Sequence, residues 1–404
     1  LALFISKLNG QTEINRLSLN EAVEIALKNN PNLTVYEYDI ESLEKQKLQA
    51  SLITNPEADF EVENFLGGNE LSGLKGSEFT LSASQLFEFG GKRSNRINLA
   101  QSEVTSAKGE YELRKLELIS NVKQVFLNLY RISKQINLQK QFIKLNEEIL
   151  STITKRVEAG RTSPAEESKV KVALINSRIE LDRLQRQSLS ASSILSSLLG
   201  TTAKQYEPII DLFESIIPPP ERVDVIDSLD QIPLINIIEN ERLLRSAKLE
   251  LEKSQAVPDL TVSGGVRYLN ELKTNSFVAG VSMPLPFFNR NQGNIESAEV
   301  LLRQVDEIKK ARMLLVATNI NSSYNNLLSA YNNSTRLKEE IIPESENAYE
   351  ITRLGYLQGR FAFIDLLDAQ RTLFDTEAQY LLELAYYYKS LIELESITGK
   401  TFIK

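Results

Sequence analysis

The segment from Ser82 to Ile97, "SASQLFEFGGKRSNRI", changes its hydrophobic period halfway along. Up to Phe89, apolar residues alternate with small polar ones, which is the period of a β-strand with two unlike faces. After Gly90 and Gly91, a charged sequence with helical spacing continues to Glu158, with no Pro and one Gly. We therefore predict that a short strand bends at the two glycines and enters a helix roughly 100 Å long.

The same succession of patterns occurs twice in the chain. Asn29 begins the segment "NNPNLTVYEYDIESLEKQKLQASLITNPEADFEVE", which is similar to "QIPLINIIENERLLRSAKLELEKSQAVPDLTVSGG" from Gln231. A second strand-to-helix transition lies near Pro284, in "VSMPLPFFNRNQGNIESAEV". We therefore predict two structural repeats, at residues 17–200 and 232–404, each with a helix, two strands and two long helices.

Two segments lie outside these repeats. Residues 201–231 contain three consecutive prolines and no sustained period, which predicts a linker. Residues 1–16 open with an apolar run, which indicates a signal-peptide remnant or a flexible N-terminus. Within the repeats we expect strands at about 57–66, 77–89, 259–269 and 275–285, long helices at about 92–158, 163–199, 290–354 and 361–398, and a short C-terminal tail.

The long helices carry a coiled-coil stripe, so the predicted fold class is mainly α with a small β part. In the first of them Leu118, Val122, Val125 and Leu129 advance by alternate steps of four and three residues. This spacing predicts long antiparallel helices that bury their apolar stripes against each other. Because the helices use their apolar stripes in contacts with each other, none of these stripes is left to cover the apolar face of the strands.

Uncovered apolar strand faces favour a membrane barrel. Each expected strand has about 10 to 13 residues, and a tilted membrane-barrel strand needs about 9–11. Four strands cannot close a barrel, and open strand edges are excluded from lipid. We therefore predict that several copies of the chain share one transmembrane β-barrel, and three copies would give twelve strands.

The glycine bend is the expected turn at the membrane interface, made of Gly90, Gly91, Lys92 and Arg93. The two cations would then meet the headgroup phosphates of the lipid. The alternative is that these two cations are simply solvated side chains at the start of a helix.

Composition excludes several classes of function. The net charge of −8 argues against nucleic acid as a partner. The sequence has no Cys and no His, which excludes thiol chemistry and His or Cys metal sites and removes the commonest general base. We therefore expect no enzyme, no cofactor and no metal centre. Two alternatives stay open: a hydrolase that uses carboxylates alone, and a coiled-coil scaffold without a pore.

A known family matches these features. Leu17 begins "LSLNEAVEIALKNNP", and Tyr356 begins "YLQGRFAFIDLLDAQRTLFDTEAQYLLELAYYY". With the duplicated architecture, these segments resemble the TolC-like outer-membrane efflux proteins, and the resemblance extends from about Leu17 to Phe402. The run "LFEFGGKR" from Leu86 further resembles the heavy-metal cation branch, which serves cobalt–zinc–cadmium-type tripartite pumps.

The resemblance implies a homotrimer with a 12-stranded transmembrane β-barrel in outer-membrane lipid, continued by a long antiparallel α-helical tunnel in the periplasm. It implies that this trimer is a passive exit duct. It implies as partners a periplasmic adaptor (membrane fusion) protein and an energised inner-membrane transporter of the RND type. The residues leave the substrate open between heavy-metal cations, drugs and proteins of type I secretion.

In this family, acidic residues and their hydrogen-bond partners narrow the periplasmic tip of the tunnel. The resemblance implies that Asp365 and Asp368 form an inward acidic pair and that Tyr356 fastens the constriction. The remaining positions implied at the tip are Glu166, Arg161 and Arg360. From spacing alone, the two aspartates share a helix face near a helix N-terminus, where the dipole stabilises carboxylates in any case.

Overall fold

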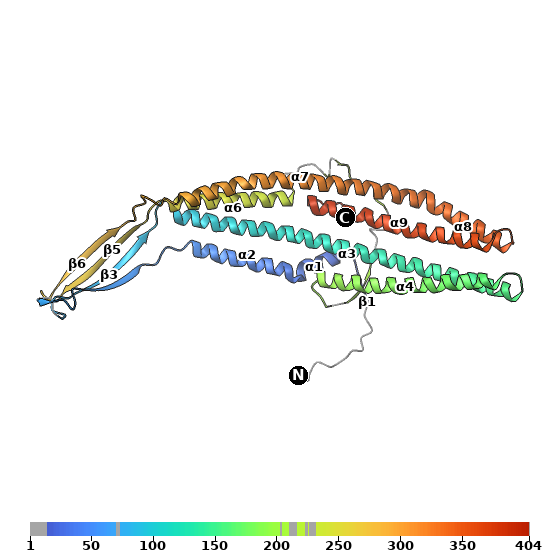
Figure 1. Ribbon diagram of the computed structural model, residues 1–404, viewed down its shortest axis with the longest axis horizontal. Helices are drawn as coiled ribbons and strands as arrows, with labels where there is room; N and C mark the ends of the chain where they lie inside the picture. Colours follow the sequence, from blue (N-terminus) through green and yellow to red (C-terminus); the bar gives the residue numbers. More distant parts are fainter. Residues whose placement is uncertain are drawn as a thin grey trace, which may run out of the picture. The chain divides into compact units, whose positions relative to one another are not determined.

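The computed structural model describes residues 14–69, 73–202, 204–209, 216–222, 225 and 232–403. Helices dominate this part of the chain, and a small amount of sheet accompanies them (Figure 1). The predicted fold class, mainly α with a small β part, is confirmed. The predicted N-terminal segment 1–16 and the predicted linker 201–231 lie largely outside the described residues.

The chain divides into two units, and each takes segments from both halves of the sequence. The first unit comprises segments of Leu1–Thr34, Glu112–Leu234 and Met313–Lys404, and the second comprises Val35–Tyr111 and Ile235–Arg312. These spatial units do not coincide with the two predicted sequence repeats, which stay a prediction.

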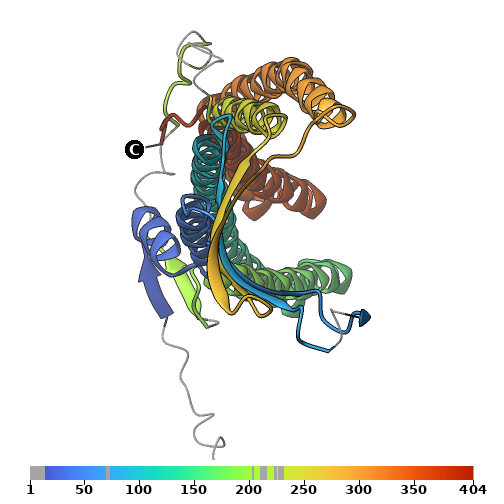
Figure 2. The same cartoon turned by 90° about the vertical axis from the view of Figure 1, so that its left-hand side faces the viewer.

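The second unit contains a four-stranded antiparallel sheet in the order β2-β3-β5-β6. Its strands are β2 (Glu57–Glu63), β3 (Glu78–Phe87), β5 (Leu260–Leu269) and β6 (Thr274–Ser282). Figure 2 shows these strands side by side in a curved sheet. Strand β2 ends earlier than predicted because Asn64 and Leu66 have φ values of 54° and 60°, which interrupt the extended backbone.

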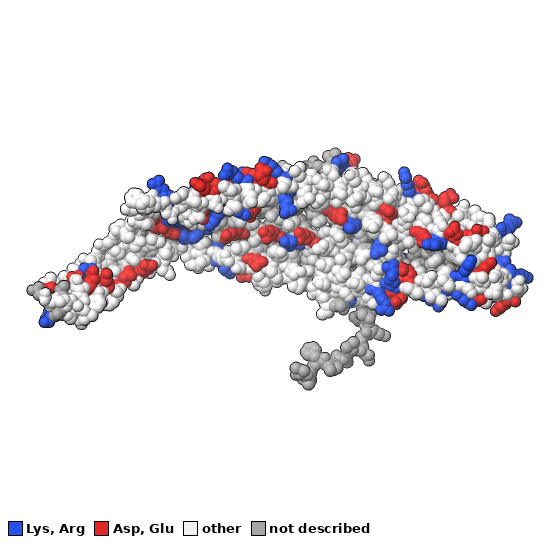
Figure 3. Space-filling view, in the orientation of Figure 1, with Lys and Arg blue, Asp and Glu red and all other residues white. Residues whose placement is uncertain are grey.

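The two faces of this sheet differ in charge. Phe60, Leu81, Val266 and Phe277 are paired in one row across all four strands, and Phe277 is 91% exposed. Every charged side chain of the four strands lies on the opposite face: Glu57, Asp59, Glu61, Glu63, Glu78 and Arg267. Figure 3 shows acidic side chains in a row along the strands. The alternation that the sequence predicts is therefore present, with one face free of charge.

Arg267 joins three strands on the charged face. Its guanidinium lies 2.8 Å from a carboxylate oxygen of Glu63 on β2 and 2.8 Å from one of Glu78 on β3. Its Nε also donates to the hydroxyl of Thr80 at 3.0 Å. Because one planar guanidinium satisfies three acceptors, it fixes the relative position of β2, β3 and β5.

The strand-to-helix bend at Gly90 and Gly91 requires glycine at both positions. Their φ values are +69° and +74°, in the left-handed region that other residues rarely adopt. A Cβ atom at Gly90 would also lie 2.8 Å from the Cβ of Val257. The backbone thus turns at the predicted place, and helix α3 (Lys92–Glu158) begins directly after it.

The two cations after the bend bind groups of this chain. The Lys92 ammonium lies 2.7 Å from the Asp259 carboxylate, and both side chains are largely buried. Arg93 donates from Nε to the carbonyl oxygen of Ser51 at 2.7 Å. These contacts tie the start of α3 to neighbouring turns, and the proposed contact with lipid headgroups stays a prediction.

Helices and a two-stranded parallel sheet make up the rest of the described chain. The strands are β1 (Ile14–Leu17) and β4 (Gln205–Pro208). The helices besides α3 are α1 (Leu19–Asn29), α2 (Pro31–Ala50), α4 (Pro164–Leu198), α6 (Pro233–Gln255), α7 (Gln292–Arg336), α8 (Ile342–Leu357) and α9 (Phe363–Thr398). None of the helices in the described residues is long and apolar enough to cross a membrane.

The predicted helix at 290–354 is interrupted by a π-helical turn. This turn, η3 (Leu337–Ile341), separates α7 from α8, and the Ile342 amide donates to the Leu337 carbonyl five residues earlier. Pro343 follows directly and has no amide hydrogen to continue the α-helical pattern. One widened turn therefore accommodates the proline.

A buried ion pair holds the end of the chain in the first unit. The Lys123 ammonium on α3 lies 2.6 Å from the Glu395 carboxylate on α9, and both side chains are largely buried. The second oxygen of Glu395 accepts hydrogen bonds from the amides of Phe402 and Ile403, each at 2.6 Å. One carboxylate thus fixes α3, α9 and the C-terminal tail.

We predict that Glu395→Gln destabilises the protein markedly, because Lys123 would stay buried without its counter-charge. Breaking a buried pair costs about 3–5 kcal/mol, which corresponds to a fall of roughly 5–15 °C in the apparent melting temperature. Thermal unfolding of the detergent-solubilised protein, followed by circular dichroism, measures this. Glu147→Gln is the matched control, since the Glu147–Arg178 pair is exposed. Equal melting temperatures for the two variants would contradict the prediction.

Candidate functional site: the tips of the two helical hairpins

Helices α3 and α4 form the first hairpin, and a glycine sets its turn. Gly160 has a φ of +67°, and the Arg161 amide donates to the Arg156 carbonyl at 2.8 Å. Ser163 then caps α4, because its hydroxyl accepts from the Ala165 amide at 3.2 Å and Pro164 opens the helix. The sequence therefore ends one helix and starts the next within five residues.

Helices α8 and α9 form the second hairpin with the same backbone device. Gly359 has a φ of +73°, and the Arg360 amide donates to the Gly355 carbonyl at 2.8 Å. The N-cap residue, Ala362, has no side-chain acceptor, but its amide donates to the Asp365 carboxylate at 2.9 Å. Asp365 thus caps α9 from within its first turn.

Close packing at the second turn requires glycine at position 355. The ring of Phe361 lies on Gly355, where a Cβ atom would come within 2.0 Å of it. Any larger residue at position 355 would displace this ring. This contact holds Phe361 against the last turn of α8, next to Tyr356.

The two hairpins meet through Tyr356 and Glu166. The Tyr356 hydroxyl, at the end of α8, donates to a carboxylate oxygen of Glu166, in the first turn of α4, at 3.2 Å. The same oxygen accepts from the Thr162 hydroxyl at 2.5 Å. This contact joins residues 190 positions apart in the sequence, so it links the tips of both hairpins.

Arg156, near the end of α3, strengthens the contact. Its guanidinium lies 4.8 Å from the centre of the Tyr356 ring and donates to the Tyr356 carbonyl oxygen at 3.3 Å. The Phe363 ring packs on Tyr356 with centroids 5.7 Å apart. A cation over an aromatic ring is worth about 0.5–2 kcal/mol, according to its exposure. Sequence reasoning missed Arg156 and Thr162, whose only local signal is their nearness to the turn.

Burial raises the pKa of Tyr356, and the charge of Glu166 raises it further. Both effects disfavour the phenolate, since one removes water and the other adds a like charge. Tyr356 therefore stays a hydrogen-bond donor over the neutral range, as its contact with Glu166 requires.

An apolar core from both hairpins supports the polar contact. Tyr356 is 6% exposed and belongs to a cluster of buried side chains from α3, α4, α8 and α9. The members are Ile149, Ile153, Val170, Tyr349, Tyr356, Phe363, Leu366 and Leu373. Parting the tips would expose much of this surface, at about 25 cal/mol per Å².

The other predicted tip residues lie apart from this contact. Asp368 is exposed and lines a groove of about 740 Å³ between α3, α4 and α9. Arg161 and Arg360 are exposed, and neither side chain forms an ion pair or hydrogen bond with another described residue. The structure thus brings Tyr356 and Glu166 together within one chain. The roles of Asp365, Asp368 and the two arginines stay predictions.

No group of three or more acidic side chains in the described part of the chain is arranged to hold a metal ion.

Comparisons with known proteins agree with this architecture. Residues 22–201 and 229–400 match the family described as "Outer membrane efflux protein". The cobalt-zinc-cadmium resistance protein CzcC of Cupriavidus metallidurans is 29% identical over 95% of this chain and 90% of its own length. The pyoverdine export outer membrane protein OpmQ of Pseudomonas aeruginosa is 20% identical over 79% of this chain and 69% of its own length.

A solved structure of CusC has the same fold. It superposes with a TM-score of 0.81 at 17% sequence identity, over 98% of this chain and 96% of the CusC chain. The predicted resemblance is confirmed, and so are the outer-membrane location and the role in efflux. The chain belongs to the outer membrane efflux protein family.

Proposed function

We propose that three copies of this chain form the exit duct of a tripartite pump for heavy-metal cations. The hydrogen bond from Tyr356 to Glu166 carries the proposal for the gate, because it ties the tips of both hairpins together. A periplasmic adaptor and an inner-membrane transporter of the RND type would supply the energy. In this scheme the chain conducts passively and opens when its partners separate the two tips.

The strength of the tip contact suits a gate. A hydrogen bond to a charged group contributes about 1.5–3 kcal/mol, and the contact of Arg156 with the Tyr356 ring adds at most about 2 kcal/mol. These polar contacts together add a few kcal/mol to what the apolar core contributes to the closed state, and a closed state favoured by a limited free energy leaves an open state accessible. A partner that binds the open arrangement more tightly can therefore shift the equilibrium.

We predict that Tyr356→Phe raises the probability of the open channel roughly tenfold or more, because it removes only the hydroxyl that Glu166 accepts. Single-channel recording in planar bilayers measures the change. Tyr386→Phe is the control, since its hydroxyl is exposed and has no hydrogen-bond partner among the described residues. If Tyr356→Phe and the control give identical records, the contact does not hold the gate.

Charge along the duct supports a cationic substrate. On the charged face of the sheet, five carboxylates accompany the single cation of Arg267. If this face lines the lumen of the barrel, cations would pass more easily than anions. Asp365 and Asp368, repeated in three chains, would add a ring of six carboxylates at the tip.

We predict that the double variant Asp365→Asn/Asp368→Asn lowers the cation preference of the pore, because three chains would together lose six negative charges. The reversal potential in a salt gradient across a planar bilayer measures this preference. Asp182→Asn is the control, because Asp182 lies on α4, is exposed and pairs with Arg186 at 3.0 Å. A reversal potential like that of the wild type in the double variant would place these aspartates outside the conducting path.

The likeness to CzcC favours metal cations over other substrates. That relative is named for resistance to cobalt, zinc and cadmium, whereas OpmQ is named for export of pyoverdine. Identity to CzcC is higher and covers more of both chains. Drug efflux and type I protein secretion remain the alternative substrate classes.

We predict that a strain lacking this gene loses tolerance to cobalt, zinc or cadmium, because the metal would no longer leave the periplasm. Growth at graded metal concentrations measures the loss, and the wild-type gene on a plasmid should restore it. Drug tolerance and protein secretion are assayed in the same strains. Unchanged metal tolerance together with a defect in either of these would reassign the substrate.

A further inference from the structure

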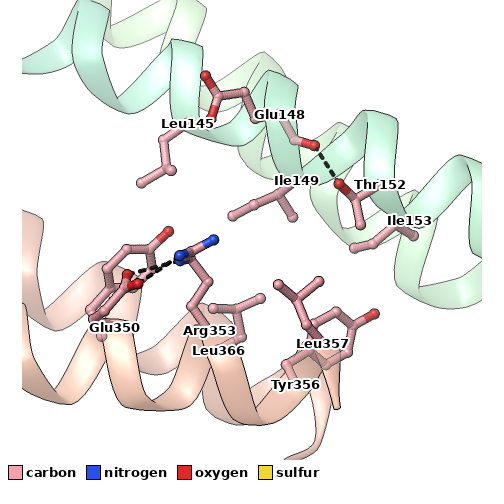
Figure 4. Close-up of a pocket in the computed structure, with 11 residues that line it drawn as sticks. Leu145, Glu148, Ile149, Thr152, Ile153, Glu350, Arg353, Tyr356, Leu357 and Leu366 are labelled. Carbon is pink, nitrogen blue, oxygen red and sulfur yellow. Dashed lines mark hydrogen bonds and ion pairs between the residues drawn. The ribbon is translucent and has the colours of Figure 1, made fainter. Parts of the chain in front are cut away.

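A pocket of about 350 Å³ lies between α3 and the second hairpin (Figure 4). Its walls come from α3, from α8 and, through Leu366, from α9. It adjoins the tip contact, because Tyr356 is one of its lining residues. The volume lies at the lower end of the range for small-molecule sites, about 300–1,000 Å³.

One part of the pocket lining is apolar. Ile149, Ile153 and Leu366 are each at most 9% exposed and belong to the tip core. Leu145 and Leu357 extend the apolar wall toward solvent. Such a surface fits a compact hydrocarbon or aromatic group.

Two polar side chains that line the pocket form no hydrogen bond with another described residue through their terminal oxygens. The Tyr349 hydroxyl oxygen is buried and has no hydrogen bond among the described residues, while the whole residue is 8% exposed. The Glu148 carboxylate is exposed, and within the described chain it forms neither an ion pair nor a hydrogen bond. A buried hydroxyl without a partner costs about 1–3 kcal/mol, which a ligand that binds it would recover.

The remaining charges at the rim are already paired. Arg353 binds both carboxylate oxygens of Glu350, at 2.6 and 2.8 Å, as the dashed lines in Figure 4 show. Glu148 therefore leaves the pocket with one net negative charge. This charge repels an anion and attracts a cation.

We propose that this pocket binds a small amphipathic amine. Its ammonium group pairs with Glu148, one of its N–H groups donates to the Tyr349 hydroxyl, and its apolar body lies on Ile149 and Leu357. Because the walls belong to both hairpins, a bound amine contacts α3 and α8 together. It therefore stabilises the arrangement in which the two hairpin tips are in contact, and this consequence rests on the proposed gate.

Binding is tested with 4-phenylbutylamine and its uncharged counterpart 4-phenylbutan-1-ol on the purified full chain in detergent, by titration calorimetry. The amine is expected to bind more tightly than the alcohol. Glu148→Gln is expected to weaken amine binding about three- to fivefold and to leave alcohol binding unchanged. Tyr349→Phe, which removes the second polar partner, is expected to weaken amine binding by a similar factor.

Two further variants test where the amine binds. Leu357→Trp fills the pocket from a half-exposed position and should abolish binding. Glu147→Gln is the matched control, because Glu147 adjoins Glu148 but does not line the pocket. An equal loss of affinity in Glu147→Gln and Glu148→Gln, or equal binding of alcohol and amine, would overturn the proposal.

The effect on the gate is measured separately, on channels opened by Glu166→Ala, since Glu166 does not line the pocket. The amine should lower their open probability, and Glu148→Gln should reduce that effect. Binding without any such effect would overturn the link to the gate and leave the pocket assigned. Absence of binding would overturn the pocket itself and leave the proposed efflux function untouched.

Discussion

The structure depends above all on one constraint, an apolar sheet face that no other described part of the chain covers. Phe60, Leu81 and Phe277 lie in register on this face and are 62–91% exposed. In water such a face would need a covering layer, whereas lipid satisfies it without one. Lipid in turn tolerates no open strand edge, and β2 and β6 are both edges of the four-stranded sheet. We infer that further copies of the chain pair with both edges, as they would in the proposed trimer.

The two hairpin tips have the same backbone turn, but the acidic residue that follows it has a different role in each. Glu166 and Asp365 each lie six residues after the turn glycine, at the third position of the following helix. In the second hairpin Ala362 cannot cap with its side chain, and Asp365 bonds the Ala362 amide. In the first hairpin Ser163 caps α4, so Glu166 can bind Thr162 and Tyr356. Because the N-cap is Ser163 in one hairpin and Ala362 in the other, Glu166 is available to join the tips and Asp365 is used as a cap.

Much of the fold could be predicted from sequence because local signals determine it. The glycine bend, the start of α3 and the alternation of the strands depend on backbone freedom and periodicity within a few residues. The π-helical turn before Pro343 could not be placed, because a proline permits either a kink or a widened turn and packing decides between them. The pairing of the central strands β3 and β5, far apart in sequence, also depends on tertiary structure.

In the candidate site, too, contacts between distant residues were harder to predict from sequence than local ones. The family resemblance named Tyr356 and Glu166, and the structure places their oxygens 3.2 Å apart. Arg156 could not be found, because its contact with the Tyr356 ring joins residues 200 positions apart. The capping bond of Asp365 was foreseeable only as a general preference of acidic residues for helix N-termini.

A duct for metal ions that is lined by such carboxylates would conduct best if each site binds weakly, since an ion must leave every site that it enters. Carboxylates meet this need better than thiolates or imidazoles, which hold zinc and cobalt firmly. Arg267 engages Glu63 and Glu78 on the charged face of the sheet. If this face lines the proposed lumen, a cation there would meet only the remaining acidic side chains without a counter-charge.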